Sequence, residues 1–247
     1  MIKKKITKMK KTIIFSLITL IAIGCTEQEK SLTLSPSQVT LHHDEQQYVH
    51  IIGEPTGVEW TSENEFVAKV DNGTIKGNHV GKTIIHAKLG NKRGTCAVDV
   101  KPKHFTYIEP IMNWGMSKSN LKSIKGTPWK ISNDGNILYY QQDAQKIIEY
   151  YSFENDLLRG SAVILAYTLA TSAPDFINER YQQYSYETDG DGNYIFYYAN
   201  ALTPETATLS ILSSLNTSTL VTTIIYTEYE HSSSVPERIK KQFIKKI

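Results

Sequence analysis

The pattern of hydrophobic and polar residues divides the chain into three parts. Residues 12–23 form an apolar run of about twelve residues that follows a lysine-rich start. From residue 31 to residue 102, short runs alternate between apolar and polar positions, and turn residues separate them every eight to twelve positions. This alternation predicts a small all-β sandwich. From residue 105 onward, helix-like and strand-like segments follow one another.

The third part, residues 105–247, indicates the order α-β-β-β twice. The first helix is expected at 117–125, with Ser117 as N-cap and Gly126 as stop, and the second begins after Ser172 and carries Pro174 in its first turn and Tyr181 and Tyr184 further on. Strands are expected at 137–142, 146–154, 161–169, 194–199, 206–214 and 218–229. We therefore predict a duplicated α+β domain with an antiparallel sheet, helices on one face, and repeats at about 110–169 and 172–229.

Recurring residues support this duplication. The set Ile137, Tyr139 and Tyr140 recurs 58 positions later, and Tyr167 recurs as Tyr226 after 59 positions. The recurring set consists of Ile195, Tyr197 and Tyr198. Matched element order makes a duplication the better explanation than chance.

The N-terminus has the pattern of an export signal. Six lysines precede the apolar run, which is too short to span a bilayer and ends in Ala22-Ile23-Gly24-Cys25. This ending resembles a bacterial lipoprotein signal. The resemblance implies a signal peptide at 1–24, cleavage before Cys25, lipid on Cys25, a polar tether at 25–30 and anchoring in a membrane. An ordinary signal peptide and an N-terminal anchor helix are the alternatives.

A set of residues in the second part carries a family resemblance. It comprises Val58-x-Trp60-x-Ser62-x-Asn64, Val67-Ala68-x-Val70, Gly73-x-Ile75-x-Gly77, Gly81 and Val98-x-Val100. The pattern resembles the bacterial Ig-like domain of group 2, found in invasin- and intimin-type surface proteins, and the resemblance implies a spacer or adhesive module without an active site. Trp60 is expected as the apolar plug between two sheets, and Gly73, Gly77 and Gly81 at turns that a Cβ would crowd.

A weaker resemblance begins the third part. The segment Trp114-Gly115-Met116-Ser117, Leu121 and Gly126-Thr127-Pro128 resembles BamE, the small lipoprotein of the outer-membrane β-barrel assembly machine. The helix-plus-sheet plan also resembles that of the β-lactamase inhibitor protein. These resemblances imply a fold and a non-enzymatic binding role. The second repeat lacks the Gly-Met-Ser start, so no partner contact is transferred.

Composition limits the function classes. The 247 residues carry 27 Lys and Arg against 25 Asp and Glu, a balance that argues against a nucleic-acid binder. Without the six lysines of residues 1–24, the count is 21 basic against 25 acidic residues. Cys96 shares a strand face with Val98 and Val100, so it is expected to be a small core residue without a disulfide partner.

Tyrosine is the candidate for molecular recognition, because 14 of the 15 tyrosines lie in residues 105–247. Adjacent tyrosines on a strand point to opposite faces, so one of each pair is expected on a solvent face that binds a partner. The candidate surface comprises Tyr139, Tyr140, Tyr150, Tyr151, Tyr197 and Tyr198. The alternative is that each pair consists of one core and one half-exposed packing tyrosine.

Candidate chemistry is sparse. The segment Asp189-Gly190-Asp191-Gly192-Asn193 begins like a calcium loop, but Tyr194 and Asn200 stand where Gly and Glu are needed, so a simple turn is favoured. Five histidines, His42, His43, His50, His79 and His86, are scattered along the second part, and no metal site is predicted from them. With no catalytic motif in the sequence, we predict no enzyme activity and no cofactor.

These observations predict a non-enzymatic outer-membrane lipoprotein of the cell envelope, periplasmic or surface-exposed. An Ig-like spacer or adhesive domain would present a module that binds a protein or glycan. An accessory subunit of an outer-membrane assembly complex and an unrecognised enzyme are the alternatives. Residues 236–247 predict a basic amphipathic helix, with Ile239, Phe243 and Ile247 on one face, which docks on the domain or contacts an anionic membrane.

Overall fold

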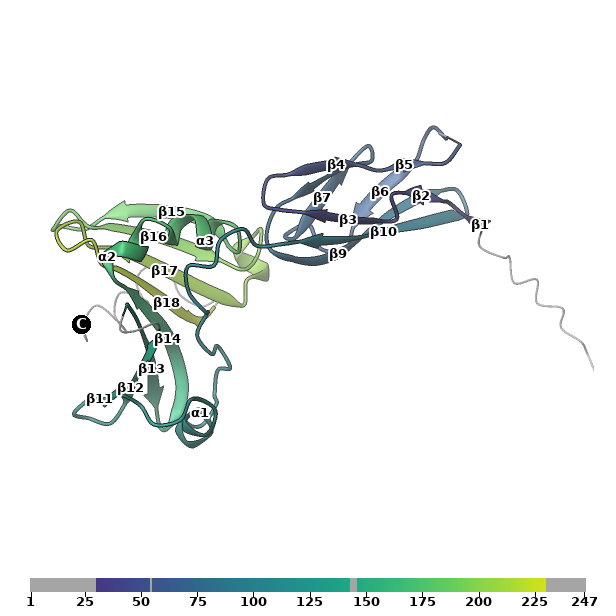
Figure 1. The fold of residues 1–247 in the computed structure, drawn as a ribbon. Helices are drawn as coiled ribbons and strands as arrows, with labels where there is room; N and C mark the ends of the chain where they lie inside the picture. Colours follow the sequence, from purple (N-terminus) through teal and green to yellow (C-terminus); the bar gives the residue numbers. More distant parts are fainter. Residues whose placement is uncertain (1–29, 54, 143–145, 230–247) are drawn as a thin grey trace, which may run out of the picture.

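The computed structural model describes residues 30–53, 55–142 and 146–229. Two domains follow each other along the chain, joined by a connection that leaves the last strand of the first (Figure 1). The predicted signal peptide, Cys25, the tether up to residue 29 and the C-terminal helix at 236–247 lie outside the described residues, and Lys30, the last residue of the predicted tether, begins the first strand. Among the described residues no helix is long and apolar enough to cross a membrane.

The first domain is a sandwich of short strands. One sheet has the order β1-β10-β9-β6, with β3 pairing in parallel with β10, and the others are β4-β8-β7 and β2-β5. The strands are β1 (Lys30–Ser31), β2 (Leu34–Ser35), β3 (Gln38–Leu41), β4 (Gln46–Tyr48), β5 (His50–Ile51), β6 (Glu59–Ser62), β7 (Ala68–Asp71), β8 (Thr74–Gly77), β9 (Gly81–Leu89) and β10 (Lys92–Val100). The alternation read from the sequence is visible in β3, β9 and β10, where buried and accessible residues take turns.

The core of this domain is aliphatic. Val49, Ile75 and Ile85 are completely buried, and so is the free thiol residue Cys96, as predicted. Trp60 packs against this core from its margin and stays half-buried, so it is less central than the predicted plug. A Cβ at Gly77 would lie 2.7 Å from the carbonyl oxygen of His42, which explains the glycine there.

The second domain is built on one eight-stranded antiparallel sheet of order β11-β12-β13-β14-β18-β17-β16-β15. The strands are β11 (Lys130–Ile131), β12 (Ile137–Gln142), β13 (Ile147–Glu154), β14 (Leu157–Leu165), β15 (Gln182–Thr188), β16 (Tyr194–Ala199), β17 (Leu209–Leu215) and β18 (Thr222–Glu228). The helices are α1 (Lys118–Lys125), α2 (Tyr167–Ala170), α3 (Ala173–Asn178) and a 3-10 turn at Pro204–Thr206. Figure 1 shows the sheet curling between its two ends.

The predicted α+β class of this domain is wrong. Of the residues that the structure describes, 49% lie in strands and 11% in helices, and these helices are short. The second helix ends at Asn178 instead of continuing through Tyr181 and Tyr184, and the chain there enters strand β15. The spacing of Phe176, Ile177 and Tyr181 fits a helical face, but the tyrosines that follow belong to a sheet edge.

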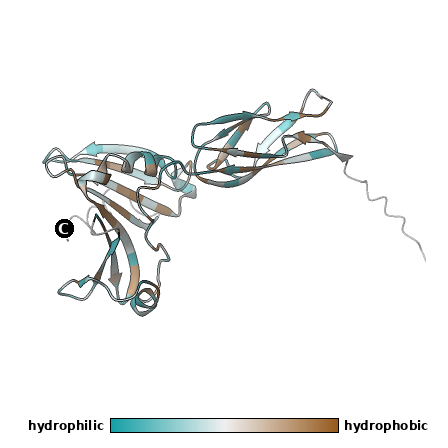
Figure 2. Cartoon of the chain, in the orientation of Figure 1, coloured by the Kyte–Doolittle hydropathy of each residue, from teal (hydrophilic) through white to brown (hydrophobic). Residues whose placement is uncertain are grey.

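Apolar clusters occupy both faces of the large sheet, which also corrects the expectation of one solvent face. Along β18, Ile224 and Tyr226 belong to one cluster with Phe176 of α3, whereas the intervening Ile225 belongs to another with Tyr197. Figure 2 shows the corresponding hydrophobic colour along these central strands. Helices cover only one of the two apolar faces in the described part of the chain.

The strand order places β12 and β16 at equivalent distances from the two edges of the sheet. These strands contain the recurring sets that begin at Ile137 and Ile195. The recurrence of Tyr167 as Tyr226 has no structural counterpart, because Tyr167 lies exposed in α2 whereas Tyr226 is buried in β18. The duplication as a whole stays a prediction.

Candidate functional site at the domain junction

The predicted tyrosine surface is not on the surface. Five of its six members have exposed fractions of 0–5%, and Tyr139 is half-buried against Tyr150. The five are Tyr140, Tyr150, Tyr151, Tyr197 and Tyr198. Because both faces of the sheet are packed, each tyrosine of a pair enters a core on its own side.

The structure instead exposes tyrosines at one edge of the sheet. Tyr186 of β15 is 66% exposed, and its ring centroid lies 6.1 Å from that of Phe196. Tyr194 of β16 is also exposed, with its ring 6.3 Å from that of Phe196. Because a helix was predicted through this segment, neither the edge strand β15 nor its exposed aromatic side chains were predicted from the sequence.

The most elaborate polar arrangement lies at the junction of the two domains and centres on Glu179. This residue directly follows α3 and is 2% exposed. Its carboxylate accepts the backbone N–H groups of Lys103 at 2.9 Å and His104 at 3.1 Å, both from the connection between the domains. The backbone carbonyl of Glu179 accepts the N–H of Val80 from the first domain at 2.7 Å. One residue therefore binds both the connection and the first domain.

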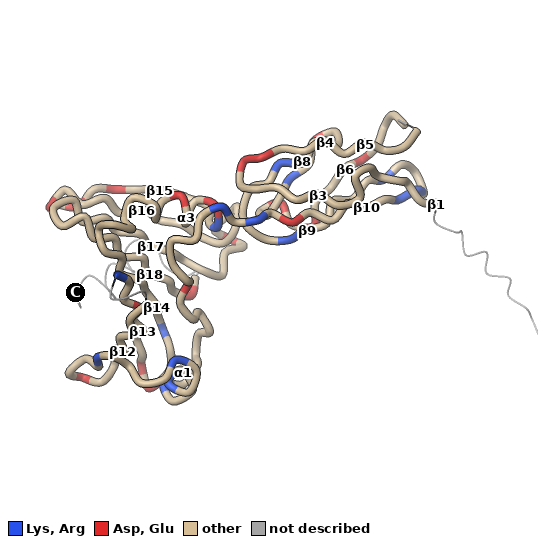
Figure 3. Tube along the Cα trace, viewed as in Figure 1, with Lys and Arg blue, Asp and Glu red and all other residues tan. Residues whose placement is uncertain are grey.

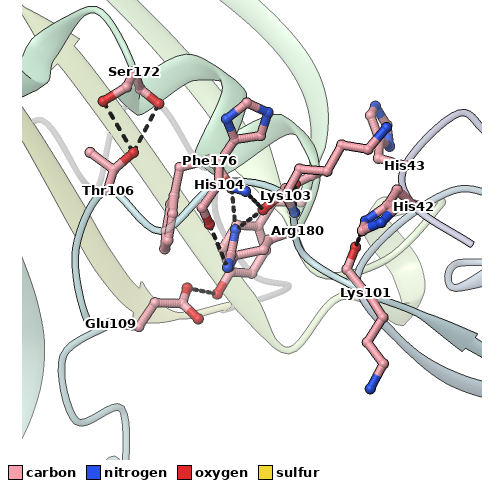
Figure 4. Close-up of polar contacts among 12 residues, drawn as sticks. His42, His43, Lys101, Lys103, His104, Thr106, Glu109, Ser172, Phe176 and Arg180 are labelled. Atoms are coloured by element: carbon pink, nitrogen blue, oxygen red, sulfur yellow. Dashed lines mark hydrogen bonds and ion pairs between the residues drawn. The ribbon is translucent and has the colours of Figure 1, made fainter.

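Arg180 completes this arrangement from the neighbouring position (Figure 4). Its guanidinium pairs with the Glu179 carboxylate and stacks on the ring of Phe176 at 3.7 Å. The same group donates to the carbonyl oxygens of Phe176 at 3.0 Å and His104 at 3.2 Å. A buried acid with a paired arginine and two N–H donors is fully hydrogen-bonded, which is the condition for keeping a charge out of water.

Further contacts extend the junction on both sides of Glu179. Lys103 Nζ lies 2.7 Å from Glu45 Oε1 of the first domain. Thr106 Oγ1 donates to the carbonyl oxygen of Ser172, 3.2 Å away, at the start of α3 (Figure 4). The connection between the two predicted parts, 31–102 and 105–247, is thus held at both domains by side-chain and backbone contacts.

Three of the histidines that the sequence reading treated as scattered lie together at this end of the first domain, which corrects that reading. His42 Nδ1 donates to the carbonyl of Lys101 at 2.9 Å, and His43 donates to the carbonyl of Asn78. His79 is buried, stacks on Phe66 with ring centroids 4.1 Å apart, and has its pKa lowered by burial. No group of three His, Cys, Asp or Glu residues with metal-binding geometry occurs within the described ranges.

The connection then enters the core of the second domain through buried tyrosines. The hydroxyls of Tyr107 and Tyr226 hydrogen-bond to each other, and Tyr181 donates to Glu109 Oε1 at 2.5 Å. Burial raises the pKa values of Tyr107, Tyr181 and Tyr226 far above the ordinary range, and the nearby Glu109 carboxylate adds to the effect. These phenols stay neutral and serve as hydrogen-bonding groups.

The remaining candidates are structural. Asp189 accepts backbone N–H bonds from Asp191 at 2.9 Å and Asn193 at 2.8 Å, which is the turn favoured over a calcium loop. Glu149 is buried and pairs with Lys125 of α1 at 2.7 Å while accepting the hydroxyl of Tyr151 at 2.5 Å. Neither Glu149 nor Glu179 belonged to a motif, and no sequence signal marked them.

A comparison with protein families decides the nature of the first domain. Residues 29–107 match the model of the bacterial Ig-like domain (group 2). They form a bacterial Ig-like domain of this group. The match confirms the resemblance read from Trp60 and its neighbours, and it includes the start of the connection that docks on Glu179. No curated protein sequence matches the chain.

Solved structures give distant similarities. The surface layer protein SbsC, in a structure of domains 1–6, is 12% identical over 83% of this chain and 26% of that one, with a TM-score of 0.24. A structure of SbsC domains 5–6 is 14% identical over 82% of this chain and 97% of that one, with a TM-score of 0.23. This chain therefore spans about a quarter of the longer SbsC structure.

Proposed function

We propose that the protein is a non-enzymatic cell-envelope lipoprotein in which the Ig-like domain holds the second domain as a rigid spacer. The second domain would bind a protein or glycan through the exposed aromatic edge formed by Tyr186 and Tyr194. The family match supports an extracytoplasmic role, because group 2 Ig-like domains resemble modules of bacterial surface proteins. Anchoring would come from lipid on Cys25.

The observation that carries this proposal is the buried contact of Glu179 with both the connection and Val80. A spacer fixes the position of the domain that it carries only when the junction between the two domains resists bending. Interfaces between domains of one chain are usually polar and allow relative motion unless they are large and hydrophobic, so a polar junction needs several directional contacts to stay fixed. Here the buried Glu179 carboxylate, the largely covered Arg180 guanidinium and the Phe176 ring form directional contacts, and hydrogen bonds strengthen where access to water is reduced.

The rigidity is tested by measuring the distance between spin labels at two exposed positions, Lys69→Cys in the Ig-like domain and Ser119→Cys in the second domain. Cys25→Ser prevents labelling there, and Cys96 is buried. We expect a single narrow distance distribution that Glu179→Ala broadens. Glu228→Ala, an exposed acid of the second domain, is the matched control and should leave the distribution narrow. A broad distribution in the parent protein would refute a rigid spacer.

The anchor is tested by Cys25→Ser in cells fed a labelled fatty acid. The parent protein should incorporate label and sediment with membranes, and the variant should lose both properties. Equal sedimentation of the two proteins would rule out the lipid anchor.

The binding edge is tested by affinity purification from detergent-solubilised cells with the parent protein and with Tyr186→Ala. Loss of partners in the variant, but not in Tyr167→Ala, would support the aromatic edge. Tyr167 is a suitable control because it is 60% exposed, like Tyr186 at 66%, but lies in α2. Identical partners for all three proteins would refute the edge as the binding surface.

A further inference from the structure

A groove of about 550 Å³ lies in the Ig-like domain, away from the junction. Its walls come from the β4–β5 segment, the chain leading into β6 and the turn between β7 and β8. Strand β8 runs from this turn toward His79 and Val80, so the groove and the junction lie at opposite ends of that strand. The volume falls in the usual range of small-ligand sites. The spacer role uses none of these residues.

Two aromatic side chains converge in the groove. Tyr48 is 59% exposed, and Trp60 is half-buried at the margin of the core. Between them lies Gly73, whose φ is +81°. A Cβ on Gly73 would lie 3.2 Å from Cε2 of Tyr48 and 3.4 Å from Cζ2 of Trp60. The missing side chain thus lets both rings pack close to one point of the backbone.

The described residues that line the groove offer hydrogen-bonding groups, and a carboxylate adjoins them, because Asn72 donates to Asp71 Oδ1 at 3.0 Å. Among the described residues that line it, none is Lys, Arg, Asp or Glu, although charged residues make up 21% of the chain. The side chains of His50, Thr56 and Asn72 offer polar atoms beside the rings. Among the described lining residues an anionic ligand would meet no Lys or Arg and would face the adjoining Asp71 carboxylate, and a purely apolar ligand would form no hydrogen bond with His50 or Thr56.

We propose that this groove binds a neutral glycan. A pyranose ring has a face of C–H groups that stacks on an aromatic side chain and a rim of hydroxyls that both donate and accept hydrogen bonds. Tyr48 and the exposed edge of Trp60 would contact the C–H face, and His50, Thr56 and Asn72 would meet the hydroxyls. This site goes beyond the proposed function and does not depend on it, since it lies outside the aromatic edge of the second domain.

The test follows the indole N–H signals of the ¹⁵N-labelled full chain during titration with neutral oligosaccharides. The chain has three tryptophans, and Trp129, which is 57% exposed in the second domain, reports nonspecific effects. Oligomers of N-acetylglucosamine, mannose and galactose are the probes, and oligogalacturonate is the anionic comparison. We expect at least one neutral series to shift the Trp60 signal at millimolar concentration while Trp129 stays unchanged and oligogalacturonate has no effect.

Tyr48→Ala should weaken that binding about tenfold, because it removes the exposed ring from a surface that tolerates truncation. Tyr167→Ala, with nearly the same exposed fraction, should leave the affinity unchanged. The proposal is overturned if no neutral series shifts the Trp60 signal, if Trp129 shifts in parallel, or if Tyr48→Ala binds as tightly as the parent. Unfolding of Tyr48→Ala would show in its amide spectrum, and Tyr48→Phe, which keeps the ring, then replaces it: retained binding supports stacking, and lost binding refutes it.

Discussion

The two domains are stabilised by different kinds of core. The Ig-like core consists of aliphatic side chains and Cys96, and its packing is non-directional. The core of the second domain contains buried tyrosines whose hydroxyls bind one another or carboxylates, as in the Tyr181–Glu109 and Tyr151–Glu149 pairs. Figure 3 shows few charges along the central strands of that sheet. The second domain therefore depends on the ionisation state of its groups, and the Ig-like domain much less.

The largest effect that separates the domains should come from alkaline pH. Burial raises the pKa of Tyr198 to about 12, and Tyr107, Tyr181 and Tyr226 are shifted further in the same direction. The unfolded chain releases these protons near pH 10, so stability is present below that pH and is lost as the pH rises toward and past 12. Tyr198 alone should account for roughly 2–3 kcal/mol.

Circular dichroism together with tyrosinate absorbance checks this prediction in the full chain. We expect cooperative loss of the second domain's signal together with a step of tyrosine ionisation. The Ig-like domain contains only the exposed Tyr48 and should survive to higher pH. If both domains unfold together, or if the tyrosines ionise gradually without unfolding, the contrast between the cores is wrong.

Next in size should be Glu179→Ala, at about 3–5 kcal/mol, because it leaves the largely covered Arg180 side chain, 11% exposed, without its ion-pair partner. Two backbone N–H groups would also lose their acceptor. Denaturant unfolding followed by fluorescence measures the loss, which should fall on the second domain and leave the Ig-like transition in place. Glu179→Gln keeps an oxygen acceptor and should lose less. Equal losses in both domains would mean that the junction couples them into one folding unit.

The difference between the two cores also explains which structural elements could be predicted from the sequence. In the Ig-like domain, period-two alternation and the glycines near Trp60 indicate the sandwich, because each strand needs only an apolar face. In the second domain β12 and β16 are found with their observed bounds, and α1 has its predicted Ser117 cap, which accepts the N–H of Asn120 at 3.2 Å. Local sequence signals are sufficient to predict these elements.

Elsewhere local signals are ambiguous. The segment from Tyr181 to Tyr186, which follows α3, fits a helical face and a strand equally well, since tyrosine is accepted in both, and pairing with β16 from Gln182 onward decides for the strand. The contacts at the domain junction could not be predicted from the sequence for another reason. Glu179 is distinguished only by partners 75 and 76 positions away, and no pattern along the chain records such contacts.

Trp60→Ala tests the aliphatic core directly. Because Trp60 lies at the core margin, we expect a loss of about 2–3 kcal/mol rather than the roughly 3–5 kcal/mol of a fully buried tryptophan. Thermal unfolding should show a lower transition for the Ig-like domain and none for the second domain. Ile52→Ala, a truncation at a position 64% exposed, is the control. A loss as small as that of the control would place Trp60 outside the core.

Tyr226→Phe tests the polar core with the smallest change of shape. It removes one hydroxyl and leaves that of Tyr107 without its partner, so we expect a loss of about 1–2 kcal/mol. Replacing both residues by Phe should restore part of the stability, because the unpaired group disappears. Denaturant unfolding of the two single variants and the double variant forms the required cycle. Strictly additive losses would show that the hydroxyls do not cooperate.

The smallest predicted effect is a loss of stability of the Ig-like domain at acidic pH. It affects the other domain, and the other end of the pH range, from the alkaline effect described above. Burial lowers the pKa of His79, opposed by its bond to the Phe66 carbonyl at 2.8 Å and by the charge of Asp44, and assisted by His43. The unfolded histidine takes up its proton near pH 6.5, before the folded one. Stability is therefore present above that pH and is lost as the pH falls through the lowered value.

Denaturant unfolding near neutral pH and at about pH 5 measures this loss. Each variant is compared with the parent at both pH values. The deficit of His79→Gln should shrink in acid, because the parent loses a contribution that the variant lacks. His86→Gln is the matched control, since His86 lies exposed on β9 of the same domain beside Glu63 at 2.8 Å, and its protein should keep the acid sensitivity of the parent. If His79→Gln loses as much stability in acid as the parent does, the sensitivity belongs to another group, and the aliphatic core would be independent of pH at both ends of the range.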